Sequence, residues 1–181
     1  MKVTPLKIPD VKLIEPNLFE DQRGSFFESF NQKKFNEFVE ADISFVQDNQ
    51  SKSTEGVLRG LHCQRRPYAQ GKLVRVLIGE IFDVAVDLRN QSKTFGQWLG
   101  LALSEQNNKQ LWIPEGFAHG FIVTSKEAVV SYKVTEYYNK DHEIVINYND
   151  KELGIDWPHT KKKELSQKDS AGLSLNDFRK L

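Results

Sequence analysis

Two of the four histidines in the sequence lie where an imidazole could act as an acid or a base. His62 ends the run VLRGLH, and His119 lies within the run FAHGF; both runs are apolar and typical of strands. A lone histidine in such a run is more often a core residue whose ring nitrogens are satisfied. However, Arg59 precedes His62 by three residues, and an arginine in an apolar strand is costly to bury unless it meets an anion or a carboxylate. Gly60 can relax the alternation that would place Arg59 and His62 on opposite faces.

A tyrosine and a lysine could complete such chemistry. Tyr132 lies in the run VVSYKV, so strand alternation directs it to the apolar side. It is either a core tyrosine with a bonded hydroxyl or a phenol that lines a barrel interior and serves as a general acid. Lys72 follows a glycine and opens an apolar run. It is either solvated or directed into a cavity, where it could stabilise an oxyanion.

A metal site is a further interpretation of the histidines. Barrels that bind a metal often take two histidines, two positions apart, from one strand, whereas position 64 here is Gln64. A site made of His62, His119 and a glutamate remains open, because the chain between the two histidines can close in the fold.

Short runs of Val, Ile, Phe, Trp and Tyr, separated by Gly, Pro, Asn and Asp, predict an all-β sandwich or barrel. The runs 73–78 and 81–88 flank Gly79-Glu80, which predicts a hairpin. In the second run the even-numbered residues are apolar and the alternate positions largely polar. Asn31 is expected to cap a helix that places Phe35, Phe38 and Val39 on one side. Other strands are expected over 43–48, 57–63, 97–103, 110–113, 117–123, 128–137 and 144–148, and a short helix near 175–181.

The polar run QDNQS, from Gln47 to Ser51, follows an apolar segment. Its composition favours a turn. The alternative is a cluster of hydrogen-bonding groups at the mouth of a pocket, where loops often serve function.

Length and composition limit the class of protein. The chain has 181 residues, is 39% hydrophobic and 28% charged, and has a formal net charge of zero. These values predict one domain over residues 1–181, with its core at about 8–169 and a short polar C-terminal tail. The lack of basic excess disfavours nucleic acid and anionic membranes as partners. One cysteine excludes an intrachain disulfide framework, and no leader or membrane span is evident, so we expect a cytoplasmic protein.

Six runs in order closely resemble the dTDP-4-dehydrorhamnose 3,5-epimerase family. They extend from about residue 8 to residue 169 with no large insertion, and each is only moderately specific alone. They are FVQDN, VLRGLH, QGKLVR, FDVAVDLR, WIPEGFAHGF and LSQKD.

The resemblance implies a cupin-type jelly-roll barrel with short flanking helices that forms a homodimer and uses no metal or redox cofactor. It implies a dTDP-sugar substrate, dTDP-4-dehydro-6-deoxy-D-glucose, inverted at C3 and C5 in the route to dTDP-L-rhamnose. By the same resemblance His62 is the base, Asp169 orients it, Tyr132 is the acid and Lys72 faces the C4 oxygen. The remaining residues match substrate-binding positions: Arg23, Phe26, Glu28, Gln47, Asp48, Asn49, Arg59, His119, Glu143 and Lys168.

Cys63 stands where the family commonly has an aromatic residue, and alternation points it away from His62, so we expect a change in packing only. Two alternatives to the double epimerase stay open. One is an enzyme that epimerises only C5 or isomerises a related 4-keto sugar nucleotide. The other is a sugar-nucleotide-binding cupin without activity, although the presence of His62, Tyr132 and Asp169 together argues against it.

Overall fold

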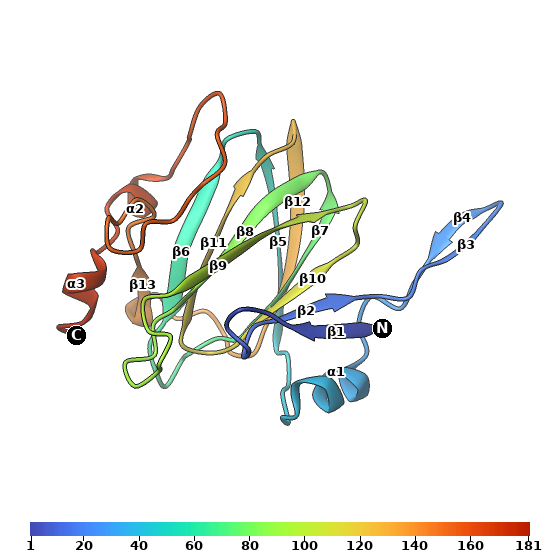
Figure 1. Cartoon of the computed structure of the whole chain (residues 1–181), viewed down its shortest axis with the longest axis horizontal. Coiled ribbons are helices and arrows are strands. Elements are labelled where there is room, and N and C mark those ends of the chain that lie inside the picture. The colour runs from blue at the N-terminus through green and yellow to red at the C-terminus, as the bar shows by residue number, and fades with distance from the viewer.

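Two antiparallel β-sheets packed face to face form the body of the protein (Figure 1). The computed structural model describes residues 1–181. One sheet has six strands in the order β1-β2-β10-β7-β12-β5, and the other has five in the order β13-β6-β11-β8-β9. The strands are β1 (Lys2–Pro5), β2 (Lys12–Glu15), β3 (Phe19–Asp21), β4 (Gly24–Phe26), β5 (Gln47–Thr54), β6 (Leu58–Gln64), β7 (Lys72–Ile78), β8 (Glu80–Asp87), β9 (Trp98–Ser104), β10 (Gln110–Ile113), β11 (Phe117–Val123), β12 (Glu127–Val134) and β13 (Glu143–Val145).

The predicted all-β class and the two helices at its ends are confirmed. Helix α1 (Gln32–Val39) begins after Asn31, whose side chain accepts a hydrogen bond from the amide of Lys34, as an N-cap residue should. Its Phe35 is buried against Trp112 on the outer face of the six-stranded sheet. Helix α3 (Leu175–Phe178) lies within the expected C-terminal helix. No helix has the length and apolar character needed to cross a membrane.

The predicted hairpin around Gly79 is wrong. Strands β7 and β8 both exist, but β7 pairs with β10 and β12, whereas β8 pairs with β9 and β11. The turn at Gly79 therefore passes from one sheet to the other, which is how a jelly roll joins its layers. Gly79 has φ +78°, and a Cβ there would lie 1.9 Å from the carbonyl oxygen of Glu127. The turn needs glycine, but its two strands belong to different sheets and do not pair with each other.

The predicted alternation along β8 is present, but both of its faces are buried. Val84 and Val86 lie in an apolar cluster on the outer face of the five-stranded sheet, covered by Trp157 and other residues of the C-terminal segment. The polar positions Asp83 and Asp87 point the other way and are fully buried. The interior of the barrel therefore contains carboxylates, and each has a basic partner, His119 or Arg89.

The run QDNQS is a strand and not a turn. Residues 47–54 form β5, which pairs along its whole length with β12. Exposure alternates so that Gln47, Asn49, Ser51 and Ser53 face the interior. The expected strand over 43–48 consequently begins only at Gln47. Residue propensity does not predict this strand, because an edge strand that faces a polar cavity needs polar side chains on its inner face.

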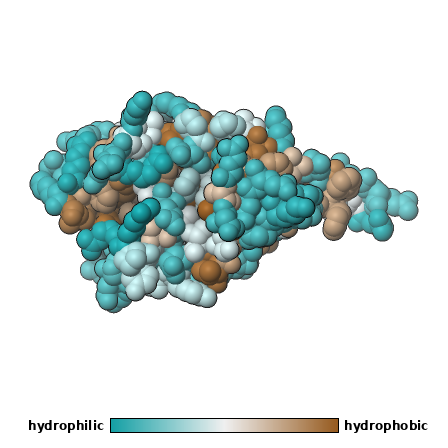
Figure 2. Space-filling view, turned by 90° about the horizontal axis from the view of Figure 1, so that it is seen from below, coloured by the Kyte–Doolittle hydropathy of each residue, from teal (hydrophilic) through white to brown (hydrophobic).

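The N-terminal and C-terminal regions differ in how closely they pack against the two sheets. Strands β3 and β4 form a hairpin that projects from the body, as the ribbon and the space-filling view show (Figures 1 and 2). We call residues 19–26 the arm. The segment after Ser166, expected to be a polar tail, forms α2 (Gln167–Ser170) and α3 and contributes buried Leu175 to the outer cluster.

Candidate active site

His62 and Asp169 form a hydrogen-bonded pair, although 107 positions separate them in the chain. His62 Nε2 lies 2.5 Å from Asp169 Oδ1. Strand β6 supplies the histidine, and the short helix α2 supplies the carboxylate, which is 5% exposed. Ser166 fixes the aspartate further, because its hydroxyl accepts a hydrogen bond from the Asp169 amide at 3.1 Å.

The charge of Asp169 determines the tautomer of His62. Burial alone would raise the pKa of Asp169, but the bonds to His62 and Ser166 and the nearby charges of His62 and Lys168 hold it below its ordinary value. The carboxylate is therefore ionised and can only accept. His62 Nε2 must carry the proton, so the neutral ring keeps its lone pair on Nδ1. This is the arrangement of an oriented general base.

Lys72 brings a buried cation beside this pair. It is 7% exposed, and its Nζ donates to the carbonyl oxygen of His62 at 3.0 Å. Burial lowers the pKa of Lys72, although the charges of Cys63, Glu143 and Asp83 oppose that effect. A desolvated ammonium in this position would interact strongly with an oxyanion.

Tyr132 stands on the opposite sheet. It lies on β12, directly across from inward-facing Asn49 of β5. Burial raises the pKa of the Tyr132 phenol, and the charge of Arg59 acts in the other direction. The phenol therefore keeps its proton at neutral pH. His62 and Tyr132 thus approach the same space from the two sheets of the barrel.

A chain of three polar side chains forms a further wall. Glu143 accepts hydrogen bonds from Lys168 Nζ at 2.9 Å and from the Tyr138 hydroxyl at 2.8 Å. Burial would raise the pKa of Glu143, but these two bonds and the charges of Lys168 and His62 lower it. The wall therefore presents an ionised carboxylate whose charge is balanced by Lys168.

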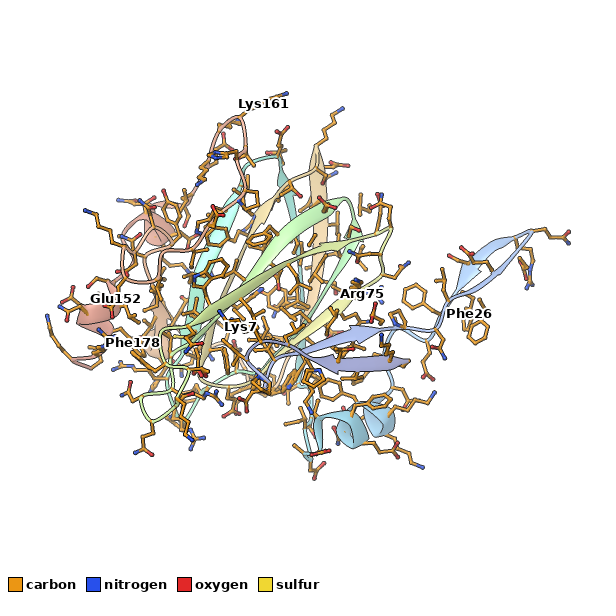
Figure 3. All side chains as sticks on the ribbon, in the orientation of Figure 1. Lys7, Phe26, Arg75, Glu152, Lys161 and Phe178 are labelled. Carbon is orange, nitrogen blue, oxygen red and sulfur yellow. The ribbon has the colours of Figure 1, made fainter.

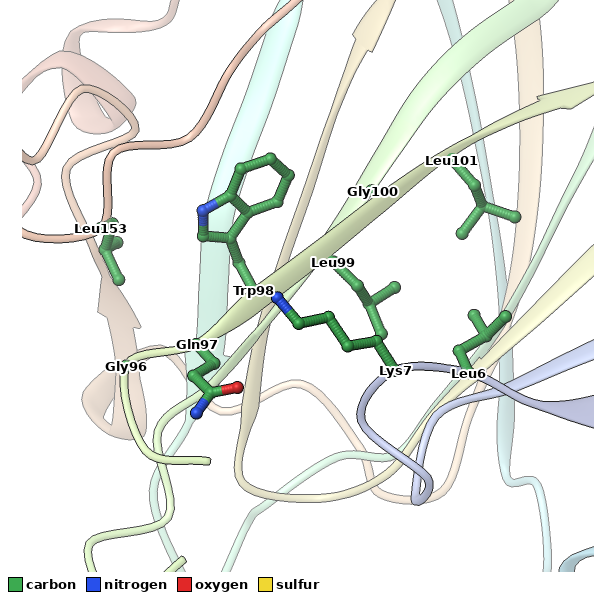
Figure 4. Close-up of a pocket in the computed structure, with 9 residues that line it drawn as sticks. All are labelled: Leu6, Lys7, Gly96, Gln97, Trp98, Leu99, Gly100, Leu101 and Leu153. Carbon is green, nitrogen blue, oxygen red and sulfur yellow. The ribbon is translucent and has the colours of Figure 1, made fainter. Parts of the chain in front are cut away.

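These groups enclose one cavity of about 380 Å³. It is lined by Gln47, Asn49, His62, Cys63, Gln64, Gln70, Lys72, Tyr132, Tyr138, Glu143 and Lys168. A larger cavity of about 630 Å³ lies along β9, where Lys7 is the only charged residue in the lining (Figure 4). Only the first cavity combines a base, an acid and a buried cation, so we assign the candidate active site to it.

The family model for dTDP-4-dehydrorhamnose 3,5-epimerase matches residues 5–177. The chain belongs to the dTDP-4-dehydrorhamnose 3,5-epimerase family. It is 56% identical to the dTDP-4-dehydrorhamnose 3,5-epimerase of Salmonella typhimurium over 176 residues, which is 97% of this chain and 96% of that protein. The family's isomerase activity, an epimerisation in dTDP-L-rhamnose biosynthesis, is therefore the activity of this chain, and the predicted epimerase activity is confirmed.

Solved structures agree with the epimerase assignment. The Legionella pneumophila dTDP-6-deoxy-D-glucose-3,5-epimerase in complex with dTDP-4-keto-L-rhamnose is 51% identical and superposes with a TM-score of 0.94, covering 97% of this chain and 93% of that one. A 3'-monoepimerase from Streptomyces bikiniensis in complex with dTDP-quinovose is 30% identical with a TM-score of 0.92, covering 97% and 89%. The fold is thus shared by double and single epimerases.

Three of the predicted epimerase site residues on the barrel strands lie outside the cavity lining. Arg59 is exposed, and its Nε donates to Ser53 Oγ at 3.0 Å. His119 is buried opposite His62 in the β6–β11 pair, and its Nε2 lies 2.7 Å from Asp83 Oδ1. Asp48 is on the outer face of β5 and pairs with Lys133. Alternation along β5 separates it from Gln47 and Asn49.

The predicted substrate-binding residues of the N-terminal region do not line this cavity. Phe26 is on the arm and points away from the barrel (Figure 3). Arg23 is at the tip and pairs only with Asp21 of the same arm. Glu28 follows the arm and bonds to Asn31 and Lys34 at the start of α1. The fold of one chain does not bring these three residues to the cavity.

Sequence reasoning missed three lining residues, Gln64, Gln70 and Tyr138. Gln64 follows His62 by two positions, so strand alternation could have found it. Gln70 and Tyr138 are on loops, and no periodic signal marks them. Cys63 is buried in the outer apolar cluster, and burial raises its pKa to about 11, which agrees with the expected packing role. No three His, Cys, Asp or Glu side chains gather as a metal site would require.

Proposed function

We propose that the chain inverts C3 and C5 of dTDP-4-dehydro-6-deoxy-D-glucose, with His62 as the base that removes each proton. The observation that carries this proposal is the 2.5 Å His62–Asp169 pair, which shares a cavity with Tyr132 and buried Lys72. Binding alone would require neither an oriented base nor an acid facing it.

The C4 ketone of this substrate makes the protons on C3 and C5 acidic, because the carbanion left behind is an enolate. His62 Nδ1 takes the proton, the electron pair of the C–H bond forms a double bond to C4, and the π pair of the C4 carbonyl moves to its oxygen. Asp169 stabilises the imidazolium that forms. Lys72 stabilises the enolate oxygen, because a buried ammonium acts at full strength where water is excluded. No redox step occurs, so no oxidant or reductant is needed.

Inversion then requires a proton on the opposite face of the carbon. Tyr132 supplies it, and the enolate collapses back to the ketone. The resulting phenolate and imidazolium exchange protons with water before the second centre reacts. The support for this pairing is that His62 and Tyr132 come from opposite sheets and line one space.

The arm supports a proposal for assembly. Phe19 and Phe26 are 63% and 72% exposed, and the predicted substrate-binding residue Arg23 lies at the tip of the arm. Large apolar side chains on a projecting hairpin favour contact with another surface. We infer a homodimer in which each arm reaches the cavity of the second copy and completes its nucleotide site.

A single epimerase is the second candidate, because the 3'-monoepimerase structure matches this fold closely. Incubation of the substrate in heavy water separates the candidates. A double epimerase introduces deuterium at both C3 and C5, as mass spectrometry or NMR of the recovered sugar would show. Label at one carbon alone would identify a single epimerase, and label at neither would indicate a binding protein and overturn the proposal.

His62→Ala is the internal control for the same experiment. General base catalysis is typically worth about 10²- to 10⁴-fold, so exchange at both carbons should fall by at least that lower factor. Binding of dTDP, measured by calorimetry, should persist because the imidazole acts on the sugar. Retention of more than about a tenth of the exchange rate would assign the base to another residue.

A further inference from the structure

Gln64 makes three hydrogen bonds at the edge of the cavity, all to main-chain atoms. It ends β6 two residues after His62 and is 6% exposed. Its Nε2 donates to the carbonyl oxygens of Tyr68 at 2.6 Å and Tyr137 at 3.2 Å. Its Oε1 accepts from the amide of Asn139 at 2.7 Å. Both amide hydrogens and the carbonyl of this side chain are therefore used.

Two of these bonds lie on either side of Tyr138. The carbonyl of Tyr137 and the amide of Asn139 flank it in the chain, and Gln64 bonds to both. The side-chain amide thus acts on this loop as a neighbouring strand would, by donating to one peptide group and accepting from another. The third bond ties the loop to Tyr68, which belongs to the connection between β6 and β7.

Burial does not hold Tyr138 in place. Its side chain is 53% exposed, and the one hydrogen bond of its hydroxyl is donated to Glu143. Glu143 is opposite Gln64 in the β6–β13 pair and also accepts from Lys168. The position of Tyr138 on the cavity wall therefore depends on its backbone, which Gln64 anchors. Tyr138 is hydrogen-bonded to Glu143, which is in turn bonded to Lys168, and both of these residues are predicted to contact the substrate.

We propose that Gln64 is a positioning residue that holds Tyr138 against the cavity and so determines how tightly the sugar nucleotide binds. This inference rests on the proposed function, because it concerns the same cavity and substrate. Gln64 itself takes no part in proton transfer. Its effect passes through Tyr138 to the Tyr138–Glu143–Lys168 wall, where it changes substrate affinity and leaves the His62–Tyr132 chemistry intact.

The test is a double-mutant cycle on KM and kcat with Gln64→Met, Tyr138→Ala and the double variant. Gln64→Met keeps the length of the side chain and removes all three bonds. It should raise the KM for dTDP-4-dehydro-6-deoxy-D-glucose about tenfold, while kcat changes by less than about threefold. In the Tyr138→Ala background the same substitution should change KM by less than about twofold, because residues that act through one another are not additive.

Asn107→Leu is the matched control. Asn107 also makes three side-chain bonds to the main chain, to Ser104, Lys109 and Ala102, but it lies in the turn between β9 and β10 and does not line the cavity. Its KM should stay within about twofold of wild type even if stability falls. A general loss of packing would change the KM of Gln64→Met and of Asn107→Leu alike.

If Gln64→Met does not fold, Gln64→Glu keeps the size and the acceptor but sets a carboxylate against the carbonyls of Tyr68 and Tyr137. Its KM should be raised at neutral pH and recover in acid, where protonation restores a donor. An unchanged KM in the glutamate and methionine variants would overturn the inference, as would an equal effect with and without the Tyr138 side chain. Failure of the wild-type protein to turn over the substrate would instead refute the proposed function.

Discussion

At the scale of single residues, the candidate site separates two tasks that one group cannot perform. A base that returned its own proton would restore the starting configuration, so inversion needs a second group on the other face. His62 and Tyr132 meet this requirement because they come from different sheets and line one cavity. The pKa directions agree with the roles, since Asp169 stays ionised and Tyr132 stays protonated at neutral pH.

Tyr132→Phe should uncouple removal of a proton from its return. The substitution keeps the ring packing and deletes only the hydroxyl. Proton abstraction by His62 would persist, so deuterium from heavy water should still enter the substrate. Epimerised product should form about 10²-fold or more slowly. Near-wild-type rates of both exchange and epimerisation would assign the acid to another residue or to water.

Lys72 should set the alkaline limit of the reaction. Burial lowers the pKa of Lys72, so the lysine loses its proton at a lower pH than an ordinary lysine does. The rate should then fall at a pH below the ordinary lysine pKa of about 10.4, because the neutral amine no longer stabilises the enolate. The pH profile of kcat/KM measures this limit.

Lys72→Met provides the comparison for that profile. It should lower kcat by about 10²- to 10³-fold, as expected when a preorganised oxyanion partner is removed. Its remaining activity should show no alkaline decline at the wild-type position. An unchanged alkaline limb in Lys72→Met would mean that a different group titrates there.

At the scale of elements, the turn at Gly79 connects the two sheets. Gly79→Ala should lower the free energy of unfolding by about 3 kcal/mol or more, because the new methyl group would collide with a main-chain carbonyl as well as adopt an unfavourable φ. Gly24→Ala is the control, since Gly24 also has a positive φ, +117°, but nothing lies within 4 Å of the added atom. It should cost about 1 kcal/mol. Chemical denaturation measures both, and equal effects would contradict the steric argument.

At the scale of the whole molecule, the arm is the segment that projects from the body and does not pack against the barrel of its own chain (Figure 1). If it completes the cavity of a second copy, then inactive variants should complement each other. Chains with His62→Ala have intact arms, and chains with Arg23→Ala have intact bases. A mixed dimer would hold one cavity with both an intact base and an intact arm, so mixing should restore activity up to about half of the wild-type value per mixed dimer.

The opposite geometry gives a different result in the same experiment. If each arm served its own cavity, every cavity in the mixture would lack either the base or the arginine. Activity would then equal the average of the two separate variants. Subunits should be exchanged by partial unfolding and refolding before the assay, and each variant refolded alone serves as the baseline.

Much of the molecule follows from local patterns in the sequence. The apolar, β-prone runs that form β10 and β11 and the Asn31 cap of α1 are short-range features, and the structure has them where they are expected. His62, Tyr132 and Lys72 could be singled out because a polar group in an apolar run requires a partner. Asp169 could be assigned only through the family resemblance, because nothing local connects it to His62.

Only the tertiary structure decided which strands pair and what each face meets. The run around Gly79 is compatible with a hairpin and with a crossover, and the choice depends on partners such as β10 and β12 that are distant in the chain. The run QDNQS forms a strand because it pairs with the edge of β12 and because its inward-facing polar side chains line a polar cavity. Gln64 holds Tyr138 from 74 positions away. Strand pairing and side-chain bridges of this kind are non-local, so they form only when the whole barrel closes.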